Sequence, residues 1–135
     1  MKILRLILGD QLNLKHSWYN KVDPNITYLM AEMRQETDYV AHHIQKVVAF
    51  FQSMREFSED LKEKGHQVTY FNINDSNNLQ ALDKIIQQQL EAIKADKFEY
   101  QCPDEYRLDE QLLGICKDLS IPTEAFESEH FYTSR

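Results

Sequence analysis

Short apolar runs alternate with longer amphipathic stretches along this chain. The runs at Lys2–Leu8 and Asn25–Glu32 contain β-branched residues and are typical of strands buried on both faces. Three further strands are predicted at His66–Ile73, Lys97–Cys102 and Pro122–Ser128. The pattern therefore predicts five short strands spread over the whole chain.

The longest amphipathic stretch follows the second strand. Thr37 or Asp38 can cap a helix there, because short oxygen-bearing side chains accept hydrogen bonds from the free amides of a first turn. Gly65 is suited to the left-handed conformation that ends many helices. The apolar residues between these points follow a 3.6-residue period: Val40, Ala41, Ile44, Val47, Val48, Phe51, Met54, Phe57 and Leu61.

Two shorter helices are predicted in the second half of the chain. One is capped by Ser76 or Asn77, and its inner face comprises Leu79, Leu82, Ile85, Ile86, Leu90 and Ile93. The other runs from about Asp104 to Leu119, and its inner face comprises Leu108, Leu112, Leu113 and Ile115.

Strands that alternate with helices indicate βαβ units and a parallel sheet. Right-handed crossovers then give an α/β fold, a three-layer α/β/α sandwich with a parallel, Rossmann-like five-stranded sheet. A length of 135 residues suits a single domain over residues 1–135, and only 3 glycines and 3 prolines argue against long linkers.

Charge and cysteine content narrow the range of functions. The net charge of -7 disfavours nucleic-acid binding by this chain itself, because a phosphate backbone requires clustered cations. No apolar stretch approaches the roughly 20 residues that span a bilayer, and no signal peptide is recognisable at the start. Cys102 and Cys116 have no zinc-ligand spacing and are expected to be reduced thiols, which favours a cytoplasmic protein.

Candidate ligand residues follow the first two strands. In an open parallel sheet, ligands bind beyond the carboxyl ends of the strands, near the switch point. Asp10 follows the first strand and Glu32 ends the second, while Glu36 and Tyr39 lie just beyond. Of these, Asp10, Glu36 and Tyr39 could gather with Gly9 and hold a small polar heterocycle by carboxylate and backbone hydrogen bonds. The alternative is that the acids are solvated loop residues and that Tyr39 covers the start of a helix.

Other familiar sites are disfavoured. His42 and His43 are adjacent, whereas helical metal ligands are spaced i,i+4, and the residues at that spacing are Lys46 and Val47. The chain has neither a glycine-rich dinucleotide motif nor a phosphate-binding loop, and no serine stands in the context of a nucleophile elbow.

Three segments carry a resemblance to a known family. They are "LILGDQL" at residues 6–12, "ETDYVAHHIQKVVAFFQSMREFSEDL" at 36–61 and "PDEYR" at 103–107. Together they resemble the amino-terminal domain of the photolyase-related proteins, the bacterial iron–sulfur cryptochromes and (6-4) photolyases. The resemblance implies a sheet of the photolyase N-terminal type and a parent flavoprotein, a lyase of DNA repair or a blue-light photoreceptor.

The resemblance also implies a light-harvesting antenna chromophore in this domain, 6,7-dimethyl-8-ribityllumazine. Gly9 and Asp10 would contact it from the end of the first strand, and Ala31 and Met33 would line it after the second. Glu36 would hydrogen-bond the polar edge of its ring. The apolar walls would be Tyr39 and Phe50.

In this family, FAD, a 4Fe-4S cluster and the DNA-lesion site belong to a helical carboxyl-terminal catalytic domain that the present chain lacks. The resemblance therefore implies that the partner is the protein's own C-terminal domain, that DNA is reached only through it, and that this chain carries no catalytic centre. An exposed domain interface could also support a homodimer. Two alternatives stay open: a structural docking module without a chromophore, and a small α/β enzyme with Asp10 and Glu36 as acid and base.

Overall fold

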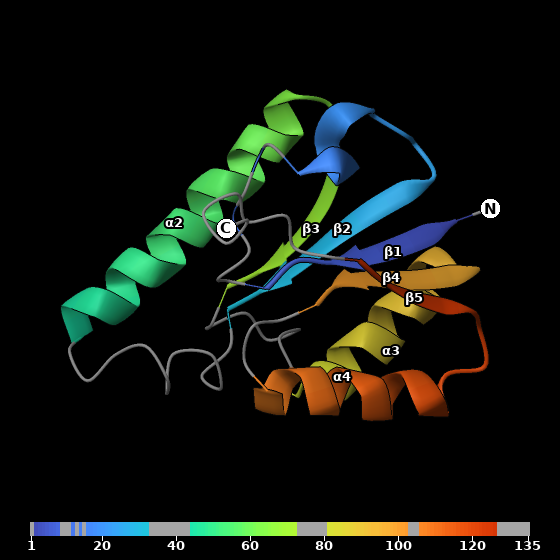
Figure 1. Cartoon of the computed structure of the whole chain (residues 1–135). Helices are drawn as coiled ribbons and strands as arrows, with labels where there is room; N and C mark the ends of the chain where they lie inside the picture. The colour runs from blue at the N-terminus through green and yellow to red at the C-terminus, as the bar shows by residue number, and fades with distance from the viewer. Residues whose placement is uncertain are drawn as a thin grey trace, which may run out of the picture.

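The computed structural model describes residues 2–8, 12, 14, 16–32, 44–72, 81–102 and 106–126, with the backbone alone at 44–48, 50 and 106–108. Its elements are β1 (Ile3–Leu6), the 3-10 helix η1 (Ser17–Asn20), β2 (Ile26–Ala31), α2 (Ile44–Glu63), β3 (Gln67–Phe71), α3 (Leu82–Ile93), β4 (Lys97–Gln101), α4 (Tyr106–Asp118) and β5 (Thr123–Phe126). Figure 1 shows a central sheet with α2 on one side and α3 and α4 on the other.

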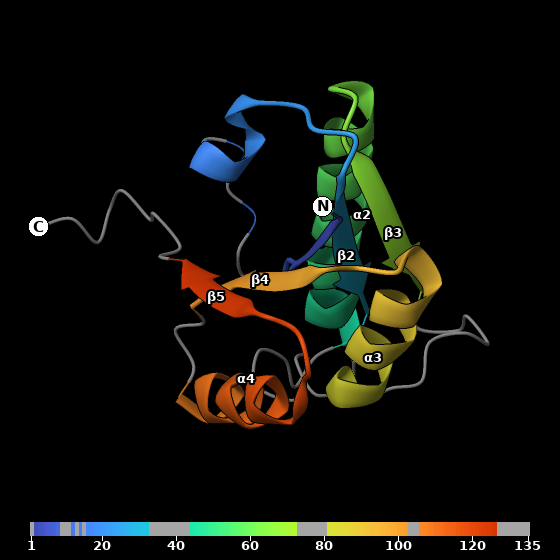
Figure 2. The same ribbon diagram turned by 90° about the vertical axis from the view of Figure 1, so that its right-hand side faces the viewer.

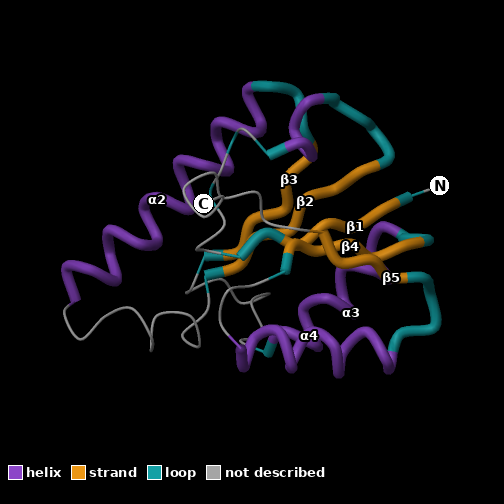
Figure 3. The backbone as a smooth tube through the Cα atoms, in the orientation of Figure 1, coloured by secondary structure: helices purple, strands orange, loops and turns teal. Residues whose placement is uncertain are grey.

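All five strands are parallel and are ordered β3-β2-β1-β4-β5. β1 lies in the middle, where Leu6 is in register with Leu29 of β2 and with Tyr100 of β4. Figure 3 shows the strands as one layer between helices. The predicted α/β/α sandwich with a parallel, Rossmann-like five-stranded sheet is therefore confirmed.

Each face of the sheet has its own apolar core, because alternate residues of a strand point to opposite faces. The α3–α4 face buries Leu4, Leu6, Leu8, Leu29, Ala31, Phe71, Leu82, Ile85, Ile86, Leu90, Phe98, Tyr100, Leu112 and Ile115. The α2 face buries Ile7, Trp18, Tyr19, Ile26, Tyr28, Met30, Phe51, Met54, Phe57 and Leu61. This division explains why the strands read as unbroken apolar runs.

The short helix η1 was not expected from the sequence. It lies on the same side of the sheet as α2, away from α3 and α4 (Figure 2). The side chain of His16 caps it, because the ring Nδ1 accepts a 3.0 Å hydrogen bond from the Trp18 amide. Trp18 and Tyr19 are each 5% exposed, so one turn of helix supplies two large rings to the core.

Two details of the predicted helices were wrong. The N-cap of α3 is Ala81 rather than Ser76 or Asn77, because the extended backbone of Ala81 (φ -138°) precedes a first turn that begins at Leu82. Leu113 of α4 is 45% exposed, whereas Leu112 and Ile115 are buried. Adjacent helical residues point about 100° apart, so Leu112 and Leu113 cannot both face the sheet.

Gly65 ends α2 as the sequence predicted. Its φ of 100° lies in the left-handed region. The Gly65 amide donates to the Lys62 carbonyl at 3.0 Å, and the His66 amide donates to the Leu61 carbonyl at 3.0 Å. This pair of bonds is the Schellman arrangement, which satisfies the last carbonyls of a helix.

Substituting alanine at two glycines should change stability in opposite directions. Gly65→Ala should lower the free energy of unfolding by about 1 kcal/mol, because a side chain disfavours positive φ. Gly114→Ala should raise it by about 1 kcal/mol, because Gly114 lies within α4 and a new Cβ meets no atom within 4 Å. Urea denaturation measures both, and a Gly65→Ala variant as stable as the parent protein would contradict this account of the helix end.

Candidate functional site

The candidate site lies beyond the carboxyl ends of the parallel strands. The strand order reverses direction at β1, with β2 and β3 on one side and β4 and β5 on the other. The topological switch point is therefore between β1 and β4, the position where ligands bind in open α/β sheets. In the sequence, Asp10 follows β1, one of the two strands that border this switch point.

Two of the predicted chromophore residues fall in the described part of the chain. Ala31 ends β2 and is 7% exposed, and Phe50 belongs to α2, where only its backbone is described. The methyl group of Ala31 belongs to the core on the α3–α4 face, whereas α2 covers the opposite face. The predicted residues outside the described part are Gly9, Asp10, Met33, Glu36 and Tyr39.

A buried carboxylate stands directly after β2. Glu32 is 0% exposed and accepts two hydrogen bonds from the Arg55 guanidinium, Nε to Oε2 at 2.6 Å and Nη2 to Oε1 at 3.0 Å. The Tyr70 hydroxyl donates to Glu32 Oε2 at 2.6 Å. Glu32, Arg55 and Tyr70 are called the strand-end clamp below, because they join the end of β2 to α2 and β3.

Contacts within the strand-end clamp help to determine the protonation states of Arg55 and Tyr70. The hydrogen bond to Glu32 raises the pKa of Arg55 above its ordinary value. Burial, and then the hydrogen bond to Glu32, raises the pKa of Tyr70. Arg55 and Tyr70 are therefore both protonated donors at neutral pH, and both oxygens of Glu32 are engaged.

A second charged network crosses the α2 face of the sheet. Arg5 of β1 pairs with Glu99 of β4 (Nε to Oε1, 2.7 Å) and donates from Nη1 to the Tyr28 hydroxyl at 3.2 Å. Lys97 bridges Glu99 at 2.9 Å and Glu124 of β5 at 2.6 Å. Charges on three neighbouring strands, β1, β4 and β5, are thus paired with one another.

An aromatic cluster covers this network. The Arg5 guanidinium lies 4.7 Å from the centre of the Trp18 ring, within the range of a cation–π contact. Next to it, the His66 ring meets the Tyr19 and Tyr28 rings edge-on at 5.8 and 5.4 Å. His66 is 6% exposed, and burial lowers its pKa, so the ring is neutral at pH 7.

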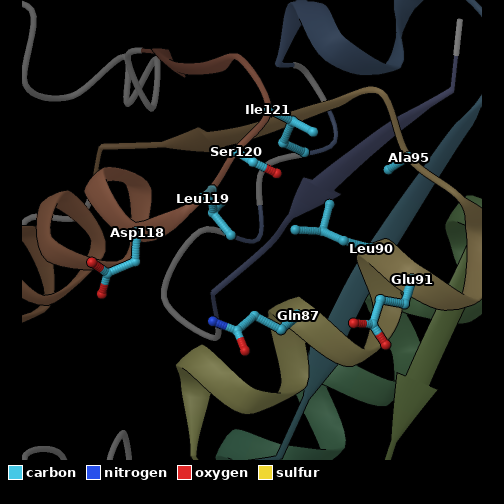
Figure 4. Close-up of a pocket in the computed structure, with 8 residues that line it drawn as sticks. All are labelled: Gln87, Leu90, Glu91, Ala95, Asp118, Leu119, Ser120 and Ile121. Carbon is cyan, nitrogen blue, oxygen red and sulfur yellow. The ribbon is translucent and has the colours of Figure 1, made fainter.

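Two cavities are lined by described residues. The first, of about 320 Å³, lies between α3 and the segment that joins α4 to β5 (Figure 4). Leu90 and Leu119 reach into it, and Glu91 and Asp118 stand on opposite sides of it in Figure 4. The second, of about 500 Å³, is lined by Arg5, Ser17, Trp18, Lys21, Val22, Asp23, Pro24, Ile26 and Phe126. Neither is lined by a predicted chromophore residue.

Comparison with known proteins identifies the family. Residues 5–135 match the family described as "Deoxyribodipyrimidine photo-lyase-related protein". The chain belongs to this photolyase-related family. It is also 28% identical over 135 residues to a protein named "(6-4) photolyase" from Agrobacterium fabrum (strain C58 / ATCC 33970), covering 99% of this chain and 27% of the relative. The photolyase-related chain therefore spans about a quarter of the length of that relative.

Within its described residues, the photolyase-related chain has no group of three or more histidine, cysteine or acidic residues able to hold a metal ion. Cys102 and Cys116 are not joined in a disulfide, and each is partly buried. Burial raises the pKa of Cys116, which makes it a poor nucleophile. His42 and His43 lie outside the described residues. Among the helices described, none combines the length and apolar character needed to cross a membrane.

Several partners in these networks were missed by the sequence analysis. Arg5 and Glu99 were passed over as parts of apolar strands, although a charge inside such a run is itself a signal that a buried partner exists. Tyr70 was also missed. Only the pairing of β2 with β3, which sets Met30 against Tyr70, brings its hydroxyl to Glu32.

The stability of this photolyase-related chain should fall below neutral pH because of His66. Its folded-state pKa is lowered, so the unfolded chain takes up the proton first. The contribution is present above the unfolded pKa of about 6.5 and is lost as the pH falls toward the folded value. His66→Phe keeps a ring against Tyr19 and Tyr28 but cannot titrate.

Urea denaturation at intervals from pH 7.5 to 5 checks this. The parent protein should lose stability relative to His66→Phe by up to about 1.4 kcal/mol per pH unit. Parallel pH profiles for the two proteins would show that His66 is not the titrating group.

Proposed function

We propose that this chain is the light-harvesting, chromophore-binding domain of a photolyase-related protein. The observation that carries the proposal is the family match over residues 5–135. The sheet supports it, because most of the predicted ligand residues follow β1 and β2 in the sequence, and β1 borders the switch point.

The proposed chromophore is 6,7-dimethyl-8-ribityllumazine. Its proposed contacts are Gly9, Asp10, Ala31, Met33, Glu36, Tyr39 and Phe50. Among the acids near this edge, Glu32 is already engaged by Arg55 and Tyr70. Hydrogen bonds to the polar edge of the ring therefore fall to Asp10 and Glu36.

The proposal places the flat ring across the carboxyl ends of the strands. Ala31 is the last residue of β2 and is 7% exposed. Ala31 belongs to one face of the sheet and α2, with Phe50, covers the other. A ligand that meets both must straddle the strand ends rather than lie against one face.

The function of the domain in this proposal is physical. The chromophore, when bound, absorbs blue or near-ultraviolet light and passes the excitation to a flavin. The protein holds the ring in a fixed orientation, excludes water from its apolar faces and hydrogen-bonds its polar edge. None of these tasks requires a general acid, a general base or a nucleophile from this chain.

The remaining functions are assigned to the rest of the protein. We place FAD, a 4Fe-4S cluster and the DNA site in a helical carboxyl-terminal domain that packs on this one. Repair of DNA, or signalling as a cryptochrome, is then an activity of the whole cytoplasmic protein. The net charge of -7 supports this division, because it makes the present chain a poor surface for a phosphate backbone.

Titration with 6,7-dimethyl-8-ribityllumazine tests the proposal. The expected result is saturable binding near 1:1, with a shifted absorption band. Asp10→Asn combined with Glu36→Gln should raise Kd at least about tenfold, because a hydrogen bond to a charged group contributes roughly 1.5–3 kcal/mol. The stability of the folded chain should change little.

The matched control is Glu91→Gln combined with Asp118→Asn, an equivalent change at exposed acids around the first cavity. It should bind the chromophore as the parent protein does. If the parent protein shows no saturable binding, the chromophore proposal fails and a structural docking module becomes the better account. Equal losses in the two double variants would mean a non-specific effect of charge.

A further inference from the structure

The strand-end clamp has a geometry that does more than stabilise the fold. We infer that Glu32, Arg55 and Tyr70 are positioning residues for the chromophore site, and that they set where α2 lies relative to the end of β2. The inference rests on the proposed function for its ligand, whereas its structural part stands on described contacts alone.

The clamp is a directional link between three elements. Arg55 donates to both oxygens of Glu32, at 2.6 and 3.0 Å, and the planar fork of a guanidinium fixes the angle as well as the distance. Tyr70 adds a third hydrogen bond at 2.6 Å from β3. The backbone amide of Glu32 also donates to the Phe71 carbonyl at 2.9 Å, so the carboxylate projects from a backbone that is itself held.

The other described contacts of α2 with the sheet are mostly apolar. Phe51, Met54, Phe57 and Leu61 are buried against the α2 face. Apolar burial favours contact but has little directional preference. A helix held only by such contacts can slide along its axis, and a displacement by one residue moves it about 1.5 Å. The clamp is a described polar contact that opposes such a shift, and the Tyr70 hydroxyl also lies 3.5 Å from the Phe51 carbonyl of α2.

Two residues of the clamp are close in the sequence to two proposed ligand residues. Glu32 directly follows Ala31, and Arg55 comes five residues after Phe50 on the same helix. A bond between Glu32 and Arg55 therefore sets the position of the Phe50 backbone relative to Ala31. In the sequence, residues 33–43 connect the same two anchors, the end of β2 and the start of α2.

A comparison of single and double variants separates positioning from stability. Arg55→Gln leaves the Glu32 carboxylate buried without its cation, so the thermal midpoint should fall clearly. Glu32→Gln combined with Arg55→Gln removes both charges, and most of that loss should be recovered. The double variant should still bind 6,7-dimethyl-8-ribityllumazine about tenfold more weakly, with a displaced absorption maximum, because the site is no longer held in register. A double variant that matches the parent protein in affinity and spectrum would overturn the inference.

The control is Glu99→Gln, which alters another buried carboxylate on the same face of the sheet. It should lower the thermal midpoint but leave chromophore affinity and spectrum unchanged. A loss of affinity equal to that of the clamp variants would show that general destabilisation explains the effect.

A measurement without chromophore keeps the two proposals distinguishable. Backbone amide chemical shifts in the Glu32→Gln and Arg55→Gln double variant should change along α2 from Ile44 onward and at Ala31. Changes confined to the neighbours of the substituted residues would overturn the positioning inference even if the parent protein binds the chromophore. If the parent protein does not bind it, the proposed function fails, and these shifts still decide whether the clamp sets the place of α2.

Discussion

The fold depends on one constraint, which is that a parallel sheet must exclude water from both of its faces. Here α3 and α4 cover one face, while α2 and the single turn of η1 cover the other. Residues beyond the ends of the strands are not under this constraint, because they do not have to fill a core. Ligands of open α/β sheets accordingly bind beyond the carboxyl ends of the strands.

The described acidic side chains that are buried in this fold are paired with a basic side chain. Arg5 and Glu99 neutralise each other in the middle of the sheet, and Arg55 does the same for Glu32 at its edge. Such pairs add little net stability. Arg55 has a side chain that is 54% exposed, so water screens its attraction to Glu32, and placing Arg5 and Glu99 inside the sheet removes charge from water. These pairs add a fixed relative orientation of the elements they join, because a salt bridge has a preferred angle and packed aliphatic side chains do not.

The sequence predicted the sheet well because five apolar runs have few other interpretations. The sequence did not predict features that depend on a single helical turn or on which face of a helix a residue occupies. η1 has too few residues to show a period, so Trp18 gave no sign that it enters the core. The position of Leu113 depends on a rotation of about 100° between neighbours, which an apolar count over a window does not resolve. The network around Glu32 required the strand order, since Tyr70 and Arg55 reach it from separate elements.

The candidate site depended on family resemblance for a similar reason. Spacing alone left two interpretations of Asp10 and Glu36 open, solvated acids or ligand contacts, because segments without a hydrophobic period carry little structural signal.

The outer strands of the sheet also affect how copies of this domain can associate. β3 and β5 are the outer strands, and an outer strand with open backbone groups invites another chain to pair with it. β5 is only four residues long, and its Glu124 holds Lys97 in an ion pair at the rim. A second copy adding a strand there would gain few ladder bonds and would have to remove that charge from water. Growth into larger sheets and fibres is therefore disfavoured at β5.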